Sequence, residues 1–417
     1  MSRRLYHAVL ALTVSALMAC GGNGKISTEP IANLPRALSA AETDLITADN
    51  QFAFALFGAI LDEADPDDNV FISPLSVAMA LGMTLNGAAG DTRDAMRATL
   101  RFTGLNQQQI NGAYRSLIDL LRGIDPNVEF LLANSIWYRQ EFTIAPAFLE
   151  LNRTYFDAEV QALDFAASGA SDTINGWVDE RTNGRIREIV PARLPDDAIM
   201  YLINAIYFKG AWTYQFDPKD TRPSPFRLAG GGETQVPMMS QDALPVFHYQ
   251  DADVEVVDLS YGGGAYRMTI ALPDAPGDIA QLTGGLSQAR WTSWTAALDS
   301  AELLVGIPTF TLETTLSLED VLDTLGMGVA FCDSGTADFS ALYPAAQPGQ
   351  VCITSVKHKT YVDVNEEGTE AAAVTAVEVG TVSAPLAVWV DRPFVFVIRE
   401  RLSGTIVFMG RVMNPST

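Results

Sequence analysis

The sequence predicts one large α+β domain behind a short N-terminal leader. From about Leu45 to Thr417 no Pro/Gly-rich break, internal repeat or low-complexity block interrupts the chain. That length suits one large domain or two closely packed halves. An apolar fraction of 48% permits a large core. A helical pattern near the start and a strand pattern near the end place both kinds of element in this domain.

Residues 1–19 have the pattern of a secretion signal. Arg3 and Arg4 form the charged region, and Leu5 to Ala19 is an apolar core too short to span a membrane. The run Leu17-Met18-Ala19-Cys20 resembles a bacterial lipobox, which implies a lipid-modified Cys20 as the first mature residue. An ordinary signal peptide with a chance Cys is the alternative. Gly21, rather than an acid, follows Cys20, so the resemblance implies a lipid-anchored protein of the cell envelope, in the outer membrane if the cell has one. An extracellular protein is the alternative.

Residues 20–44 have the composition of a flexible linker and are expected to hold the domain, 45–417, away from the lipid. Three early glycines and two prolines, Pro30 and Pro35, lie in this stretch. The net charge is -23, and removal of Arg3 and Arg4 takes two positive charges away, leaving -25. Scattered acids on a soluble, self-repelling surface disfavour nucleic acid and heparin-like polyanions as partners.

Two core elements are predicted near the start of the domain. Residues 52–57 with Ile60 and Leu61 have the apolar spacing of an amphipathic helix. Next, 69–72 is typical of a strand end, Ser73-Pro74 of a helix start, and the apolar run to Met83 of a buried helix.

Residues 366–382 carry a strand pattern inside loop composition. Counting by twos gives an uncharged face, while Glu370 and Glu378 fall on the other face. The members of the uncharged face are Thr369, Ala371, Ala373, Thr375, Val377, Val379 and Thr381. Gly368, Gly380 and the following 383–385 favour a loop. An Ala-rich helix around 370–373 is the alternative, but the β-branched residues that follow suit a pleated surface better. The segment is therefore expected to exist in two states.

The run Val364–Ala373 resembles the reactive-loop hinge of serpins, and 392–398 with 408–415 resembles the closing signature of that family. Further segments match in the family's order, namely 69–83, 133–138, 174–178, 182–186, 202–210 and 236–239. The resemblance spans roughly 45–415. It implies the serpin fold, with three β-sheets, eight or nine helices and an exposed reactive-centre loop.

The resemblance implies an inhibitor rather than an enzyme, one that traps a serine protease as a covalent acyl-enzyme. The spacing from Gly368 to Pro393 matches the length of the family's exposed loop, and the resemblance therefore implies a scissile bond at Val382-Ser383. The small Val382 indicates an elastase-like or subtilisin-like target. Residues 369–382 would then enter the central sheet. The hinge is Glu366, Glu367, Gly368, Thr369, Glu370, Ala371, Ala372 and Ala373. A non-inhibitory serpin acting as a binding or chaperone-like protein is the alternative. No cofactor is expected, and the protein is expected to be a monomer.

The family match also places a buried polar cluster under the sheet where it opens, made of Ser73, Ser76, Asn204 and His358. Such a cluster can hold two strands together and exchange partners when they part. One position departs from the family: many serpins carry a Lys that pairs with the first hinge acid, here Glu366, whereas this chain has Thr309. How firmly the top of the sheet closes is therefore left open.

Other chemistry is sparse in the sequence. Cys332 and Cys352 either form a disulfide or remain free buried thiols. The run 333–336 superficially resembles an aspartic protease loop, but that chemistry needs a second such run, and a turn is the simpler reading. With only His248 and His358 left after the signal is removed, a zinc site with several His is disfavoured and no metal is expected. No nucleophile elbow or Walker loop occurs.

Overall fold

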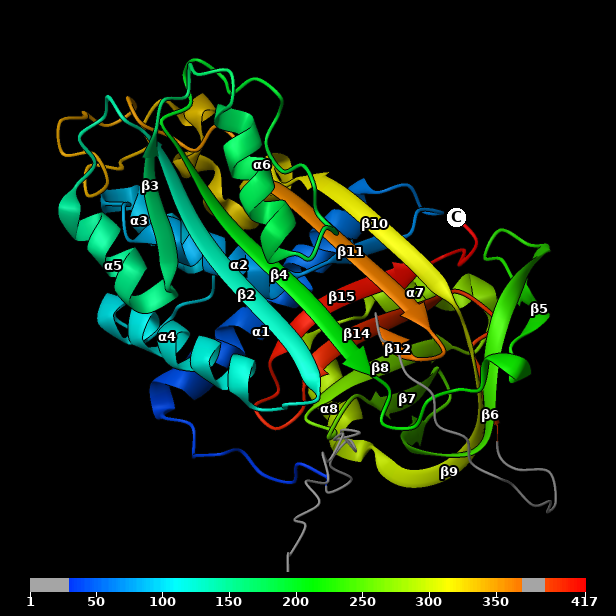
Figure 1. Ribbon diagram of the computed structural model, residues 1–417. Helices are drawn as coiled ribbons and strands as arrows, with labels where there is room; N and C mark the ends of the chain where they lie inside the picture. Colours follow the sequence, from blue (N-terminus) through cyan, green and yellow to red (C-terminus); the bar gives the residue numbers. More distant parts are fainter. Residues whose placement is uncertain (1–29, 370–386) are drawn as a thin grey trace, which may run out of the picture.

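The computed structural model describes residues 30–369 and 387–417. It contains a six-stranded and a nine-stranded sheet surrounded by helices (Figure 1). Several predicted positions lie outside the described residues: the signal peptide and Cys20, the hinge residues Glu370, Ala371, Ala372 and Ala373, and the expected scissile bond at Val382-Ser383.

Nine α-helices occur in the described part of the chain. They are α1 (Ala40–Glu63), α2 (Pro74–Leu85), α3 (Gly90–Thr99), α4 (Gln107–Gly123), α5 (Pro146–Phe156), α6 (Ala170–Arg181), α7 (Ile279–Gly284), α8 (Gln288–Ala297) and α9 (Glu319–Leu322). None of the helices within these described ranges combines the length and the apolar character that crossing a membrane requires.

The two predicted helices near the start are confirmed. The amphipathic pattern at 52–61 lies within α1, which a capping box between Ser39 and Glu42 begins. The expected domain start at residue 45 therefore falls inside this helix. α2 begins at Pro74 with Ser73 as N-cap, as the Ser-Pro pair predicts.

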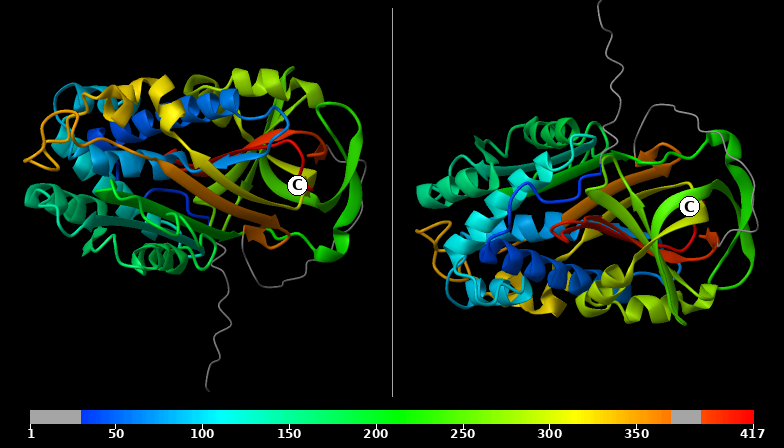
Figure 2. Two further views of the ribbon diagram at one scale, coloured as in Figure 1. Left: turned by 90° about the horizontal axis from the view of Figure 1, so that it is seen from above. Right: turned by 90° about the horizontal axis from the view of Figure 1, so that it is seen from below.

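The six-stranded sheet has the order β10-β11-β12-β4-β2-β3. Its strands are β10 (Phe310–Ser317), β11 (Lys357–Asn365), β12 (Gly368–Thr369), β4 (Met200–Ala211), β2 (Val128–Arg139) and β3 (Ala158–Leu163). Both faces of β4 are covered, because alternate residues point to opposite sides of a strand. Ile203 and Ala205 pack in a small core with residues of α6, whereas Phe208 joins the main core that contains α2. Figure 2 shows the sheet between these helical layers.

The nine-stranded sheet follows β1-β15-β14-β8-β7-β6-β9-β13, with β5 paired to β6. Its strands are β1 (Val70–Ile72), β15 (Ile406–Val412), β14 (Phe394–Glu400), β8 (Tyr266–Pro273), β7 (Val254–Ser260), β6 (Glu233–Gln250), β9 (Asp299–Pro308), β13 (Ala387–Trp389) and β5 (Arg222–Arg227). The three expected sheets thus join into two hydrogen-bonded sheets. The reason is that β6 and β9 continue as a pair across a register shift between Gln241 and Leu244.

Candidate functional site

The described end of the hinge is already part of a sheet. Gly368 and Thr369 form β12, which pairs antiparallel with β11 on one side and with β4 on the other. Thr369 lies opposite Val364 of β11 and Gly210 of β4. Figure 1 shows this short strand between the ends of its two neighbours.

A glycine is required at position 368 for two reasons. Its φ is +146°, a backbone conformation that residues with a side chain rarely adopt. In addition, a Cβ there would lie 2.1 Å from the carbonyl oxygen of Gly210. Any side chain at this position would therefore push the hinge away from β4.

Thr369 lies on the buried side of the sheet. It is only 2% exposed, and its hydroxyl lies 2.8 Å from the hydroxyl of Tyr261. Tyr261 is itself fully buried and stacks on Trp212 with ring centroids 4.4 Å apart. Burial raises the pKa of the Tyr261 hydroxyl, so it stays protonated. Thr369, the first residue of the uncharged face, thus contacts a buried pair of stacked aromatic rings.

The two acids before Gly368 are held by the chain that leaves β4. The backbone nitrogens of Phe216 and Trp212 donate to the carbonyl oxygens of Glu366 and Glu367, at 3.0 and 2.9 Å. The hydroxyl of Thr221 donates to Oε1 of Glu366 at 2.5 Å. Glu366 therefore has a neutral partner, Thr221, where the family pattern would supply a Lys at the position of Thr309.

Beyond Thr369, the facing edges of β4 and β11 have no ladder partner among the residues that the structure describes. β4 pairs along its length with β2, and β11 pairs with β10. On the facing side, the ladder partners within residues 30–369 and 387–417 are confined to β12. A strand that continued from Thr369 would find a partner edge on each side, and backbone groups there would gain hydrogen bonds.

The four predicted cluster residues come together beneath this sheet. The backbone nitrogen of Ser73 donates to Nε2 of His358 at 3.0 Å, and the Ser73 hydroxyl donates to the carbonyl oxygen of Val407 at 2.8 Å. Ser76 Oγ donates to the carbonyl oxygen of Asn204 at 3.2 Å. The cluster thus connects α2 with β4, β11 and β15.

His358 accepts a hydrogen bond from a backbone N–H, which requires a ring nitrogen without a proton. Burial lowers the pKa of His358 to about 4, so the ring is neutral near pH 7. A hydrogen bond between two side-chain amides extends the cluster from β4 to β2: Asn204 Nδ2 donates to Asn134 Oδ1 at 2.6 Å.

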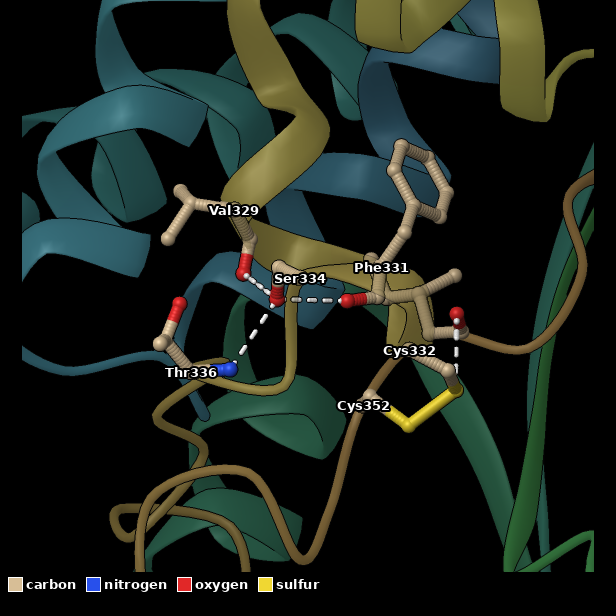
Figure 3. The surroundings of a disulfide bond; sticks show 7 residues. Val329, Phe331, Cys332, Ser334, Thr336 and Cys352 are labelled. Atoms are coloured by element: carbon tan, nitrogen blue, oxygen red, sulfur yellow. Dashed lines mark hydrogen bonds between the residues drawn. A yellow bond between two sulfur atoms is a disulfide. The ribbon is translucent and has the colours of Figure 1, made fainter.

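Cys332 and Cys352 form a disulfide with an S–S distance of 2.09 Å (Figure 3). This resolves the alternative that the sequence left open. The neighbouring run 333–336 is a turn: Gly335 has a φ of +63°, and the backbone nitrogen of Thr336 donates to Ser334 Oγ. Ser334 Oγ donates in turn to the carbonyl oxygens of Val329 and Phe331. The disulfide ties this turn to the segment that leads into β11.

Three residues of the site were missed by sequence reasoning: Trp212, Tyr261 and Thr221. Trp212 follows the 202–210 match by two positions, so an aromatic residue directly after it was a weak signal, whereas Thr221 lies eleven positions beyond the match. Tyr261 lies 108 positions before Thr369, and no spacing rule connects residues that far apart.

Comparison with known proteins gives one consistent result. The family model described as "Serpin (serine protease inhibitor)" matches residues 47–415. Leukocyte elastase inhibitor of Bos taurus is 36% identical over 383 residues, which cover 89% of this chain and 99% of that protein. Human thyroxine-binding globulin superposes with a TM-score of 0.81 at 29% identity, covering 90% of this chain and all of the other. Serpin48 of Tenebrio molitor gives 0.79 at 28% identity, covering 90% of this chain and all of the other.

Proposed function

This chain belongs to the serpin family, and we propose that it is an inhibitory member, a suicide substrate that traps a serine endopeptidase as a covalent acyl-enzyme. One observation carries the proposal: the hinge is paired on both sides at Gly368 and Thr369, at the entrance to two facing strand edges. A loop anchored in this way has a defined register in which to continue.

That register can be followed into the remaining loop. Because β12 runs antiparallel to β4, each step beyond Thr369 moves one step back along β4 from Gly210. Residue 370 would face Lys209, and Val379 would face Met200, the first residue of β4. The uncharged residues from Ala371 to Thr381 would then share the buried face with Thr369.

The expected gain in free energy is large. Thr369 is already buried, so six inward residues remain to enter the sheet. If each buries on the order of 50 Å² of apolar surface, about 25 cal/mol/Å² gives roughly 7–8 kcal/mol before any ladder hydrogen bond is counted. β4 and β11 must separate before the inserting strand contributes any burial or hydrogen bonds. Small side chains at the start of that strand keep this energy barrier low.

The chemistry is the first half of peptide hydrolysis. The serine oxygen of the protease attacks the carbonyl carbon of Val382, and the bond to Ser383 breaks, so that the new amine takes up a proton and an ester to Val382 remains. Residues 369–382, as a strand, would span about 45 Å at roughly 3.3 Å per residue. Insertion would carry the esterified protease that far and disturb its catalytic loops before water cleaves the ester.

We expect an elastase-like or subtilisin-like target. Val382 is small and β-branched and fits a shallow apolar specificity pocket, whereas residues 371–385 contain no Lys or Arg for a trypsin-type pocket. The bovine relative at 36% identity carries the name leukocyte elastase inhibitor, which supports the same class of target.

The test is incubation of the purified protein with elastase, subtilisin and trypsin, followed by denaturing gel electrophoresis and mass spectrometry. We expect a gel-stable complex with elastase or subtilisin and a released C-terminal peptide that begins at Ser383. Cleavage at that bond without any complex would contradict the proposal. A complex that forms fastest with trypsin would contradict the expected specificity.

The non-inhibitory alternative has one observation in its favour. A cavity of about 440 Å³ lies between α1, α8, β8 and β14, lined by Trp291, Arg267 and Arg399 among others. Asp258 also lines the cavity, and its carboxylate pairs with both arginines. One carboxylate against two guanidinium groups leaves surplus positive charge in the lining. One structural neighbour is a thyroxine-binding globulin, and titration calorimetry with thyroxine tests whether this chain also binds a small organic anion.

We further propose that the mature protein is a lipoprotein attached to the cell envelope through a triacylated Cys20. The expected linker 20–44 is then shorter than its composition predicts, because 30–38 packs on the domain and α1 begins at Ala40, so the tether is the part before residue 30. Cys20→Ser is expected to release the protein from the membrane fraction. An unmodified N-terminal mass of the wild-type protein, together with unchanged fractionation of the variant, would refute this attachment.

A further inference from the structure

The described part of the expected tether is packed against the domain. Ile31, Leu34 and Leu38 lie on the main apolar core, and Figure 1 shows this stretch as the dark blue trace that runs along the lower edge of the molecule before α1. The backbone nitrogen of Ile31 donates to the carbonyl oxygen of Gly263 at 2.8 Å. Arg401 Nη2 donates to the carbonyl oxygen of Ile31 at 2.7 Å.

The side chain of Ile31 rests directly on Gly263. A Cβ at Gly263 would lie 2.8 Å from Cδ1 of Ile31, so the contact depends on the bare Cα of the glycine. The backbone nitrogen of Gly263 donates to the buried carboxylate of Asp125 at 2.9 Å, which fixes the turn from beneath. Ile31 therefore covers a turn that is already held on its inner side.

The same turn carries the residue that receives the hinge. Gly264 N donates to the carbonyl oxygen of Tyr261 at 2.7 Å and closes the turn, and Gly262 N donates to the carbonyl oxygen of Ala211 at 2.8 Å. Tyr261 then meets Thr369 through its hydroxyl. The N-terminal segment and the hinge thus bind to one turn, residues 261–264, at positions two residues apart.

We propose that the segment 30–38 positions the hinge through this turn, with Ile31 as a positioning residue that acts on Thr369 by way of Tyr261. When the segment is docked, the turn holds the Tyr261 hydroxyl where Thr369 can reach it, and the hinge stays in the sheet. When the segment is displaced, the turn gains freedom and Thr369 leaves more often. Thermodynamic linkage makes the coupling reciprocal, so a hinge in place also tightens the docking of Ile31.

The first test measures amide hydrogen exchange of the full chain without protease, and it does not depend on the proposed function. Ile31→Asp is compared with Ala32→Asp, which adds the same charge at the neighbouring exposed position. We expect exchange of the hinge amides at 367–369 to rise about fivefold in Ile31→Asp, the effect of losing about one net hydrogen bond. Faster exchange at 31–38 with unchanged exchange at 367–369 would overturn the coupling.

A reciprocal test starts from the hinge. Thr369→Val removes the hydroxyl and keeps the shape, whereas Thr369→Ser keeps the hydroxyl. The Ile31 amide is expected to exchange faster in Thr369→Val by a factor similar to that seen at the hinge in Ile31→Asp, and Thr369→Ser is expected to remain near the wild type. Because linkage requires equal factors, an effect in one direction alone would also overturn the proposal.

A third readout rests on the proposed inhibition. The number of inhibitor molecules consumed per protease trapped is expected to rise about threefold to fivefold in Ile31→Asp and in Tyr261→Phe, because a hinge that leaves the sheet must re-enter it before insertion proceeds. Unchanged consumption in both variants, with altered exchange, would contradict this step. If wild-type protein traps no protease at all, the proposed function fails, while the exchange experiments still decide the coupling.

Discussion

The two sheets of this protein differ in how completely their strands are paired. In the nine-stranded sheet, β14 has β15 on one side and β8 on the other, and every residue of β14 and β15 is buried. In the six-stranded sheet, β4 and β11 each have one full neighbour, and of the residues that the structure describes, 30–369 and 387–417, only the two of β12 lie between them. Among these described residues, the strands of the first sheet are paired on both sides at its centre, whereas β4 and β11 have free facing edges beyond Thr369.

The residues explain the difference. The complete sheet is packed by aromatic rings: Phe71 stacks on Phe396 and Phe408 at centroid distances of 5.6 and 5.2 Å. The segment expected to complete the other sheet is made of small and β-branched residues. Such side chains pack well on a sheet, but each one gains little free energy from burial by itself. We propose that the nine-stranded sheet acts as a fixed frame, and that completion of the six-stranded sheet provides the free energy for a change of state.

Cleavage of the loop is expected to have the largest effect. If residues 370–382 follow Thr369 into the space between β4 and β11 after cleavage near Val382, the free energy of unfolding rises by roughly 7–8 kcal/mol from apolar burial alone. Guanidinium unfolding of intact and cleaved protein, at equal concentration, measures the gain. A cleaved form with the same unfolding midpoint as the intact form would mean that the two sheets do not differ as described.

Phe396→Ala tests the complete sheet. Removal of this fully buried ring is expected to lower the free energy of unfolding by about 3–5 kcal/mol, and by a similar amount in the intact and the cleaved protein. Denaturant unfolding of both forms checks this. A loss confined to one of the two forms would show that the frame is not independent of the loop.

His358, in β11 of the six-stranded sheet, accepts a hydrogen bond from Ser73, which directly follows β1 of the nine-stranded sheet. Protonation of His358 is expected to weaken this contact between the two sheets. Its pKa in the folded protein is about 4, below the ordinary value of about 6.5, so the unfolded chain takes up the proton first as the pH falls. The contribution is therefore fully present above pH 6.5 and is lost as the pH falls from 6.5 toward 4, by at most roughly 3 kcal/mol.

The measurement is denaturant unfolding of wild-type protein and His358→Gln between pH 4 and pH 7. The glutamine offers an oxygen acceptor to the backbone nitrogen of Ser73 and does not titrate. The stability advantage of the wild type over the variant should shrink as the pH falls. An advantage that stays constant over this range would mean that His358 does not titrate as described.

Thr221→Val is expected to have the smallest effect. The variant leaves Oε1 of Glu366 without its hydroxyl donor, at a cost of about 1 kcal/mol. We expect intact protein to convert to an inactive, loop-inserted form about fivefold faster at 37 °C, measured as loss of inhibition over time. Thr309→Lys, which introduces the cation typical of the family, should slow the conversion. Equal rates in all three proteins would show that Glu366 does not control entry to the sheet.

Much of the fold could be predicted because its signals are local. The Ser73-Pro74 pair starts α2 where expected, and the strand end expected at 69–72 contains β1, Val70–Ile72. The strand pattern from Thr369 also has its first residue on the buried face. Each of these depends on a few neighbouring residues and on the period of a strand or helix.

The missing parts depend on contacts between distant segments. Tyr261 receives Thr369, Thr221 substitutes for an absent Lys, and Ile31 rests on Gly263, yet each pair is far apart in the chain. The disulfide between Cys332 and Cys352 belongs to the same class, because spacing alone does not show whether two thiols face each other. Composition predicted a free linker up to residue 44, but Ile31, Leu34 and Leu38 pack on the core, and the backbone of Ile31 is hydrogen-bonded to Gly263 and Arg401.

We propose that loop insertion, rather than binding alone, arrests the protease, and two hinge substitutions distinguish these mechanisms. Ala371→Asp places an unpaired charge on the face that must enter the sheet, at a cost of several kcal/mol, whereas Glu370→Arg changes charge on the opposite face. With one elastase-like protease, we expect Ala371→Asp to be cleaved at Val382-Ser383 with at least a tenfold lower yield of gel-stable complex, and Glu370→Arg to stay near the wild type. Equal complex yield from Ala371→Asp and wild-type protein would contradict the insertion mechanism for this chain.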